Sequence, residues 1–274
     1  MINSARVFGP APVNFYNARL NRESLQMSLT NTFDLLADAA LALLYPRVCA
    51  ACGAQSVEAR ADSPACAKCW DATHVFSGDE TLCWKCGALA LASLPEEKRR
   101  EVRCRRCETE AFTAARACGL YEGALRAAVL GLKREPFVSA RLARMLAEAR
   151  EREPLDAATL VVPVPLHAER ERERGFNQAA VLGRILAERS GLPIDEWSLV
   201  RVAGSVRHRA GMDARGRRAS VEEAFAVARP RLVRGERVLL IDDVFTTGAT
   251  VSACAAALKA AGAREVYVLT VARA

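Results

Sequence analysis

The sequence predicts an α/β fold in which a parallel sheet is flanked by helices and preceded by a small cysteine-rich region. From residue 111 onwards, apolar strand-like segments alternate with segments of helical period. The strand-like segments lack the alternation of a half-exposed sheet, which indicates burial on both faces. Eight of the ten cysteines lie within residues 49–107, so the region before the predicted sheet has a composition of its own.

Length and composition indicate more than one folded region. The chain has 274 residues, and about 150 residues per domain is the usual expectation. We divide it into a loose N-terminal extension (1–30), a helix with the cysteine-rich region (31–110) and the α/β domain (111–274). Hydrophobic residues make up 51% and charged residues 26%, which excludes wholesale disorder and coiled coil. Met27 is an alternative start that the sequence leaves open.

Membrane insertion and secretion are not expected. No apolar run approaches the roughly 20 residues that span a bilayer, and the run over residues 35–44 is interrupted by Asp38. The first 26 residues lack the apolar core of a secretory signal. We therefore expect a cytoplasmic protein with no membrane partner.

The expected elements follow one another at short intervals. A helical period that ends at Pro46 predicts a helix over residues 31–45. Strands are expected over residues 112–121, 160–166, 237–244 and 265–272, and helices over residues 123–133, 138–151, 176–191 and 249–263. Gly191 stands past the end of its helix, where glycine is common.

The net charge of +7 lies in the C-terminal domain, where 26 basic residues face 19 acidic ones. Of the 39 basic residues, 34 are arginine, and the planar guanidinium fork suits phosphate oxygens. The alternative explanation is a GC-rich genome, which gives the same excess of arginine over lysine. Residues 201–218 alone carry six arginines and one aspartate, a composition suited to pyrophosphate or to a nucleic-acid backbone.

The cysteine spacing predicts structural zinc. Two Cys-x-x-Cys pairs close a tetrahedral site with Zn–S bonds of about 2.3 Å. The spacing differs from that of typical iron–sulfur clusters, which makes an iron–sulfur centre the less favoured alternative. A thioredoxin-like redox motif would have one Cys-x-x-Cys pair near a βαβ unit, whereas this chain has four pairs in series. We expect one or two zinc sites of four cysteines each, with consecutive pairs joined, although an interleaved arrangement fits the same spacing. The ligands are Cys49, Cys52, Cys66, Cys69, Cys83, Cys86, Cys104 and Cys107.

Zinc held by four thiolates has no open coordination position, so it contributes to folding and not to hydrolysis. Trp70 and Trp84 each stand beside a cysteine pair. Two roles are open for each tryptophan: packing across the zinc site, or stacking on a nucleic-acid base. Cys118 and Cys254 fall outside the pattern and are expected to be small buried side chains.

The stretch VLLIDDVFTTGATV (238–251) predicts a ligand site where a buried strand passes into a helix. Its loop can turn successive N–H groups and threonine hydroxyls toward an anion, and the following helix presents its positive end. Carboxylates repel phosphate but accept hydrogen bonds from ribose hydroxyls, so Asp242 and Asp243 fit the sugar of a ribose 5-phosphate group. Simple turn and cap roles are the alternative, and a Walker A loop is excluded.

These residues resemble a known family. DDVFTTGAT is similar to the signature with which type I phosphoribosyltransferases bind phosphoribosyl pyrophosphate (PRPP). The segments VPVPLHAERERERGFNQ (162–178), LYPRVCAACG (44–53) and LKRE (132–135) resemble the ComF (competence protein F) family. The resemblance covers about residues 30–274. It implies a five-stranded type I phosphoribosyltransferase-like parallel sheet with flanking helices, preceded by a double zinc ribbon with cysteine ligands, and it implies Mg²⁺ and PRPP as ligands.

The resemblance also implies roles for single residues. Asp242 and Asp243 would hold the ribose hydroxyls and assist catalysis, and His167 would lie near the pyrophosphate loop. Arg172 and Arg174 would neutralise pyrophosphate, although the Glu-Arg alternation of 169–174 equally fits a solvated helix. The 5-phosphate would be held by Thr246, Thr247, Gly248, Ala249 and Thr250.

One region departs from the family pattern. Arg209 and Ser220 stand where relatives tend to have Gln and Asn, which puts the contact with an acceptor in doubt. Residues 201–218 would form a hood over the site. Two functions remain open: a pentosyltransferase of unknown acceptor, or a non-catalytic protein that binds single-stranded nucleic acid on the same scaffold. The resemblance also implies a role in natural competence and DNA uptake, or in handling single-stranded DNA, with the competence machinery as partner.

Overall fold

The computed structural model of the chain describes residues 47–56, 64–90, 93–202 and 224–274. The expected helix over 31–45, Met27 and the positions Arg209 and Ser220 lie outside this part, as does the hood segment beyond Val202. Their roles stay predictions.

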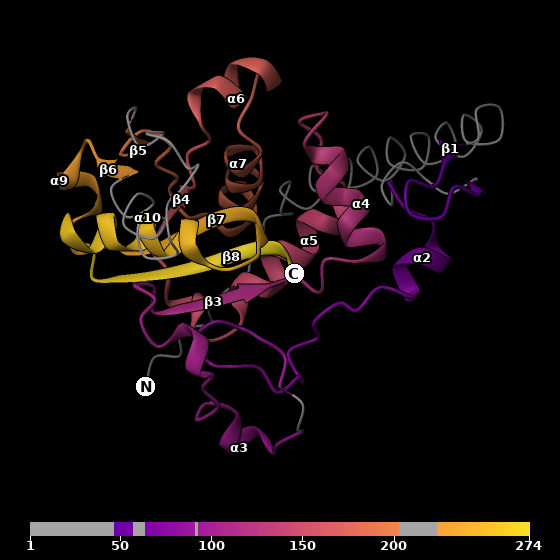
Figure 1. Cartoon of the computed structure of the whole chain (residues 1–274), viewed down its shortest axis with the longest axis horizontal. Helices are drawn as coiled ribbons and strands as arrows, with labels where there is room; N and C mark the ends of the chain where they lie inside the picture. Colours follow the sequence, from indigo (N-terminus) through magenta and orange to yellow (C-terminus); the bar gives the residue numbers. More distant parts are fainter. Residues whose placement is uncertain (1–46, 57–63, 91–92, 203–223) are drawn as a thin grey trace, which may run out of the picture.

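A four-stranded parallel sheet forms the centre of the α/β domain (Figure 1). Its spatial order is β3 (Ala114–Ala117), β8 (Glu265–Arg273), β7 (Arg237–Phe245) and β4 (Leu160–Pro163). All three strand pairings are parallel. The central strands are buried on both faces, as expected for a parallel sheet covered by helices. The fold class is confirmed.

The five strands implied by the resemblance are not all present, because the described residues contribute four strands to this sheet. At the outer edge of β4, the described residues form one isolated parallel bridge, between Val161 and Ile194. Pro193 has no N–H to extend that pairing. Asp195 then accepts hydrogen bonds from the N–H groups of Trp197 and Ser198, which turns the chain away from the sheet edge.

Helices cover both faces of the sheet. The helices α4 (Gly123–Leu132), α5 (Ala140–Glu151) and α7 (Gln178–Ser190) pack on one face, and α10 (Ala249–Ala260) packs on the other. Alternate residues of β7 face the two cores: Leu239 joins the first core and Leu240 the second. These four helices match the predicted segments to within a few residues at each end.

The cysteine-rich region packs against both faces of the α/β domain. Its first part holds β1 (Arg47–Val48), β2 (Gln55–Ser56) and α2 (Ala67–Asp71); its second holds α3 (Glu96–Arg99) and the 3₁₀ turn η2 (Arg105–Cys107). Trp70 of α2 is buried in the core that contains α4, which favours packing as its role. Cys83 and Cys86 belong to the core beneath α10.

Four further elements were not predicted as separate units. They are the short helix α6 (Ala168–Arg174), the antiparallel pair β5 (Leu199–Arg201) and β6 (Phe225–Val227), and α9 (Pro230–Val233), besides the 3₁₀ turn η3 (Leu155–Ala157). The β5–β6 pair holds the two ends of the segment that lies outside the described residues, and β6 packs against α10. Arg201 and Phe225 are paired in this register, so the chain on either side of that segment is held together.

Candidate functional site

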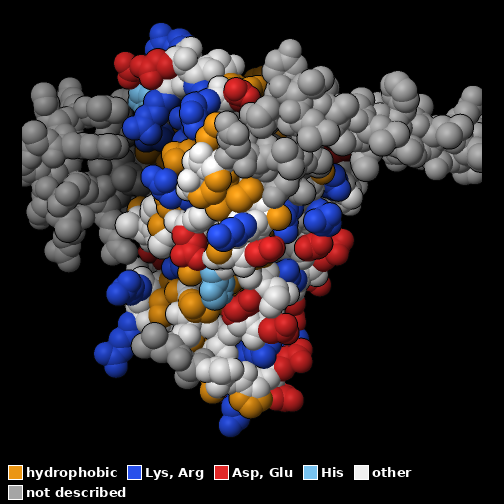
Figure 2. Space-filling model, turned by 90° about the vertical axis from the view of Figure 1, so that its right-hand side faces the viewer, with side chains coloured by type: hydrophobic (Ala, Val, Ile, Leu, Met, Phe, Trp, Pro, Cys, Tyr) orange, Lys and Arg blue, Asp and Glu red, His pale blue; other side chains and the backbone are white. Residues whose placement is uncertain are grey.

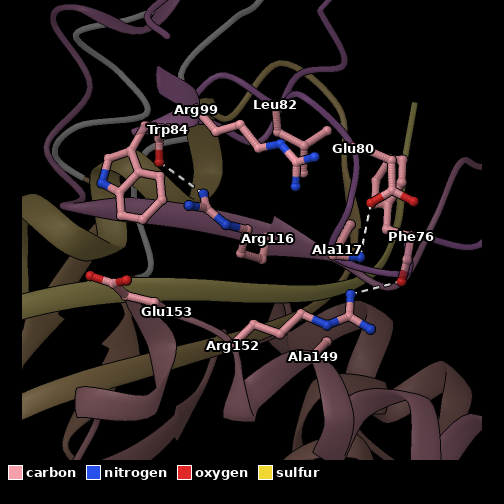
Figure 3. Close-up of a pocket in the computed structure, with 11 residues that line it drawn as sticks. Phe76, Glu80, Leu82, Trp84, Arg99, Arg116, Ala117, Ala149, Arg152 and Glu153 are labelled. Atoms are coloured by element: carbon pink, nitrogen blue, oxygen red, sulfur yellow. Dashed lines mark hydrogen bonds between the residues drawn. The ribbon is translucent and has the colours of Figure 1, made fainter. Parts of the chain in front are cut away.

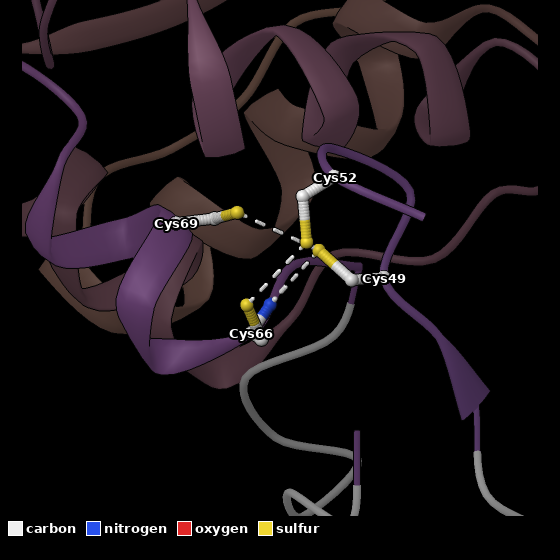
Figure 4. A group of neighbouring side chains, drawn as sticks. All are labelled: Cys49, Cys52, Cys66 and Cys69. Atoms are coloured by element: carbon white, nitrogen blue, oxygen red, sulfur yellow. Dashed lines mark hydrogen bonds between the residues drawn. The ribbon is translucent and has the colours of Figure 1, made fainter. Parts of the chain in front are cut away.

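The first metal-ligand group joins the first two cysteine pairs. The Sγ atoms of Cys49, Cys52, Cys66 and Cys69 all lie within 4.8 Å of one another (Figure 4). The distances are 3.8 Å for Cys49–Cys69 and 4.0 Å for Cys52–Cys66. Tetrahedral zinc with Zn–S bonds of about 2.3 Å requires S–S distances of about 3.8 Å, so this group fits a zinc ion.

The second group joins the third and fourth pairs, Cys83, Cys86, Cys104 and Cys107. Its sulfur atoms are closer, at 3.6 Å for Cys83–Cys107 and 3.5 Å for Cys86–Cys104. Consecutive pairing is thus confirmed over the interleaved alternative. The described residues form two sites, one beside each face of the sheet.

One thiol of each group is prepared for ionisation by backbone N–H groups. Burial opposes ionisation of Cys49, but hydrogen bonds from backbone groups of Cys66, Cys52 and Ala51 outweigh it and lower its pKa to about 6. Burial likewise opposes ionisation of Cys83, whose pKa is lowered to about 6 by backbone hydrogen bonds, first of Cys86 and then of Cys104. Thiolates are the zinc-binding form, so the backbone favours metal binding at both groups.

The phosphate loop continues β7 directly into α10. Phe245 ends the strand, and Gly248 takes a left-handed conformation (φ +85°) as the N-cap of α10. A Cβ atom on Gly248 would lie 2.8 Å from Cζ of Phe245, so only glycine fits the turn. Within the described part of the chain, the N–H groups of Thr246, Thr247 and Gly248 donate no hydrogen bond.

Those amides are therefore available to an anion at the positive end of a 12-residue helix. The side chains of Thr246, Thr247 and Thr250 are exposed, and Ala249 is half-buried with its N–H 3.4 Å from Oγ1 of Thr247. The loop presents hydroxyls and amides to solvent together.

The two aspartates differ in their surroundings. Asp243 is buried, and its Oδ2 has no hydrogen bond of good geometry, although it lies 3.0 Å from Nζ of Lys133 in an ion pair. Asp242 accepts a hydrogen bond at 2.8 Å from the N–H of Asp243. Burial, and then the negative charge of Asp243, raises the pKa of Asp242 to about 8.

Lys133 is a site residue to which sequence reasoning assigned no role. It is the C-cap of α4 and reaches Asp243 across 110 positions of the chain. The segment LKRE carried part of the family resemblance, which was the available signal. Its ammonium lies 3.0 Å from the buried carboxylate of Asp243 and supplies an opposite charge to it.

His167, Arg172 and Arg174 lie after β4, the strand beside β7, and so follow the same edge of the sheet. Nδ1 of His167 accepts a hydrogen bond from the N–H of Glu169 and caps α6. Arg172 is exposed, and Arg174 bonds Gln178. No contact joins these three side chains to the phosphate loop among the described residues. Their part in binding pyrophosphate stays a prediction.

The molecular surface is basic near α6. On the face drawn in Figure 2, Lys and Arg side chains gather at the upper left, at the height of α6 in Figure 1, whereas acidic side chains lie mainly along the lower right. The helix itself is exposed along most of its length, as the solvated-helix alternative requires. No helix in the described ranges is long and apolar enough to cross a membrane.

Two family models match the chain. The "Double zinc ribbon domain" matches residues 40–119, and the "Phosphoribosyl transferase domain" matches residues 178–274. The first match contains both cysteine groups, and the second contains the phosphate loop with both aspartates. Lys133, His167, Arg172 and Arg174 lie between the two matched ranges.

Several curated proteins are similar to this chain. The chain is 31% identical over 212 residues to the DNA utilization protein YhgH of Escherichia coli K12. This match covers 74% of this chain and 87% of the relative. It is 35% identical to YhgH of Salmonella typhimurium and 32% identical to competence protein F of Haemophilus influenzae. Those two matches each span 62% of the relative, and 51% and 50% of this chain.

A solved structure of glutamine PRPP amidotransferase from Bacillus subtilis is also similar, with 25% identity and a TM-score of 0.33. That match covers 47% of this chain and 25% of the other.

Proposed function

Since this chain belongs to the ComF family, with a double zinc ribbon joined to a phosphoribosyltransferase domain, we propose that it binds PRPP with Mg²⁺ at the phosphate loop. The single observation that carries the proposal is the pairing of free loop amides with one buried and one half-buried carboxylate near the end of one strand. The amides suit a 5-phosphate, and the carboxylates suit the hydroxyls of its ribose.

The residues present fit Mg²⁺ bound together with PRPP. Asp242 and Asp243 supply the carboxylate oxygens that Mg²⁺ takes as ligands, and Oδ2 of Asp243 lies 3.0 Å from Nζ of Lys133, its one ion-pair partner among the described residues. Asp242 and Asp243 would hold the ribose hydroxyls, and these hydroxyls would also bind Mg²⁺. Mg²⁺ would supply charge that stabilises the leaving pyrophosphate.

In this proposal, different groups of the chain bind different parts of PRPP. The amides of Thr246, Thr247 and Gly248 hold the 5-phosphate and fix the sugar relative to the acid pair. Lys133 pairs with Asp243, and the carboxylate oxygens of the acid pair accept hydrogen bonds from the ribose. Arg172 and Arg174 neutralise pyrophosphate from the neighbouring strand end. These steps describe a pentosyltransferase whose acceptor is not yet identified.

The cellular role follows from the relatives' names. They are called DNA utilization and competence proteins, and we place this chain in the same process, natural competence and DNA uptake, with the competence machinery as partner. Eight metal-binding thiols require a reducing compartment, which supports the cytoplasm as its location.

Calorimetric titration with PRPP tests the ligand. We expect saturable binding by the wild-type protein that requires Mg²⁺, and binding weakened at least about tenfold in Asp243→Asn, which removes the charge that holds the ribose. Arg264→Gln, an exposed change before β8, is the matched control and should bind as wild type. Absence of binding by the zinc-loaded wild-type protein would remove the proposal.

A second candidate is non-catalytic binding of single-stranded nucleic acid. The basic surface near α6 (Figure 2) and the net charge of +7 favour it. Titration of a labelled single-stranded oligonucleotide at several salt concentrations tests it. A steep fall of log K with log[salt] supports a surface that tracks phosphates, and a flat plot counts against one.

A further inference from the structure

A small pocket lies where the two parts of the cysteine-rich region meet the α/β domain. Its volume is about 100 Å³, and it is separate from the phosphate loop. The second zinc ribbon contributes Trp84 and Arg99, β3 contributes Arg116, and the segment that ends α5 contributes Arg152 (Figure 3). Three guanidinium groups from three separate segments therefore approach one cavity.

None of these three arginines forms an ion pair within the described part of the chain. Arg99 donates from Nε to the carbonyl oxygen of Leu94. Arg116 donates from Nη1 to two carbonyl oxygens, and Arg152 donates from Nη1 to the carbonyl oxygen of Phe76 at 2.7 Å. A guanidinium has five N–H donors, so each of the three retains donors for another partner.

The two carboxylates that line the pocket are engaged elsewhere. Glu80 accepts hydrogen bonds from the N–H groups of Ser77 and Gly78, at 2.8 and 3.0 Å. Burial opposes its ionisation, but these bonds outweigh burial and lower the pKa of Glu80, so it stays charged. Glu153 forms an ion pair with Arg100 outside the three. The three arginines and Arg100 carry four positive charges, and the two glutamates carry two negative charges, so the pocket has an excess of two positive charges.

Arg116 has a second source of compensation, because it faces the thiolates of Cys83 and Cys86. Arg99 and Arg152 have no such neighbour among the described residues. A ligand is the remaining source of negative charge for them.

Size limits the ligand. A cavity needs about 10–15 Å³ to hold one water, so 100 Å³ accommodates the oxygen atoms of one or two phosphate groups. Pockets for drug-sized molecules run to about 300–1,000 Å³. The indole of Trp84 is already stacked with Arg116 and Arg100, at 4.9 and 5.7 Å, so it does not offer an open face for a base.

The geometry points to a second anion site, in which Arg99, Arg116 and Arg152 hold a phosphate dianion between the zinc ribbons and the α/β domain. Arginine pairs with phosphate through parallel N–H···O bonds, and the dianion matches the excess charge. The phosphate can come as the free ion or as the phosphate of a nucleotide. The site does not depend on PRPP binding at the phosphate loop.

Tryptophan fluorescence of the zinc-loaded full chain tests this site, with inorganic phosphate as the probe. We expect a saturable change in the wild-type protein that is lost in Trp84→Phe. Affinity should fall at least about tenfold in the Arg99→Gln/Arg152→Gln double variant, which removes two charge-assisted partners. Arg144→Gln on α5, exposed and outside the pocket, is the matched control and should keep wild-type affinity.

Two further measurements complete the test, one on a single variant and one with a second ligand. Arg99→Gln alone changes a side chain on the surface helix α3 and is expected to fold; it should weaken phosphate severalfold. Adenosine monophosphate distinguishes the sources, since a site for the free ion excludes it and a site for nucleotides binds it. No saturable signal, or one that chloride reproduces at equal ionic strength, or one unchanged in the arginine variants, would overturn the inference.

Discussion

Arg273 donates a hydrogen bond from Nη1 to the carbonyl oxygen of Cys86 at 2.5 Å. The same guanidinium lies 4.5 Å above the ring of Phe245 and 3.8 Å from Sγ of Cys86. Phe245 in turn packs against Gly248 of the phosphate loop. Zinc bound by four thiolates carries two negative charges, so Arg273 both balances the second zinc site and connects it to the loop.

We expect Arg273→Gln to weaken PRPP about tenfold while two zinc ions stay bound, because the change removes the stack on Phe245 and leaves the cysteines intact. Zinc analysis and calorimetric titration measure the two effects separately. Arg264→Gln, just before the same strand, is the control. Equal PRPP affinity in both variants would contradict the connection.

The zinc content should be two ions per chain. Removing one ligand, as in Cys104→Ser, should lower it to one and reduce the thermal unfolding temperature, because structural zinc contributes directly to folding free energy. Cys118→Ala, a buried cysteine outside both groups, should retain both ions. Elemental analysis decides, and a single ion in the wild-type protein would be the contrary result.

Gly248→Ala should destabilise the protein by about 1–3 kcal/mol. The position has φ +85° and no room for a Cβ beside Phe245, and left-handed backbone is costly for a residue with a side chain. Gly131→Ala is the matched control, because a Cβ there meets no atom within 4 Å in the helix α4. That control should be neutral or stabilising by about 0.5–1 kcal/mol. Urea unfolding measures both, and equal stability of the two variants would argue against the strained turn.

The acid pair predicts a particular dependence of stability on pH. Burial, with the charge of Asp243, raises the pKa of Asp242 to about 8, far above its value of about 3.9 in an unfolded chain. The folded state then binds more protons than the unfolded state between these values, so this group's contribution falls as pH rises from about 4 to about 8.

Asp242→Asn removes that titration. Its unfolding free energy relative to wild type should therefore increase steadily from pH 5 to pH 8, as measured by urea unfolding at each pH. Val244→Ala, in the same strand and without a charge, controls for the change in packing and should give a constant difference. A difference between Asp242→Asn and wild type that is independent of pH would show that Asp242 ionises normally in the folded protein.

Lys133→Met should raise the pH at which the acid pair ionises, because it removes the cation 3.0 Å from Asp243. Mg²⁺-dependent PRPP binding should then shift to higher pH, and Lys133→Arg should restore it in part. The pH profile of PRPP affinity separates this effect from loss of packing, which would lower affinity equally at every pH.

Local patterns predicted the larger elements of this fold. The apolar runs of β7 and β8 and the periods of α4, α5, α7 and α10 are signals contained within each segment. The cysteine spacing identified all eight ligands. The sequence also placed Asp242 and Asp243 at the end of a buried strand, where β7 carries them.

Long-range relationships were not predictable in this way. The Lys133–Asp243 ion pair and the Arg273–Cys86 contact join residues far apart in the chain, and no local period records them. The fifth strand was expected from the resemblance, but Pro193 and the turn at Asp195 limit that pairing to a single bridge. The β5–β6 pair is three residues per strand, too short for a period to be recognised.

A structure of the zinc-loaded protein with PRPP and Mg²⁺ tests the central claim most directly. We predict that the 5-phosphate lies on the N–H groups of Thr246, Thr247 and Gly248, with the ribose hydroxyls against Asp242 and Asp243. PRPP bound away from this corner, with both carboxylates facing no ligand, would contradict it.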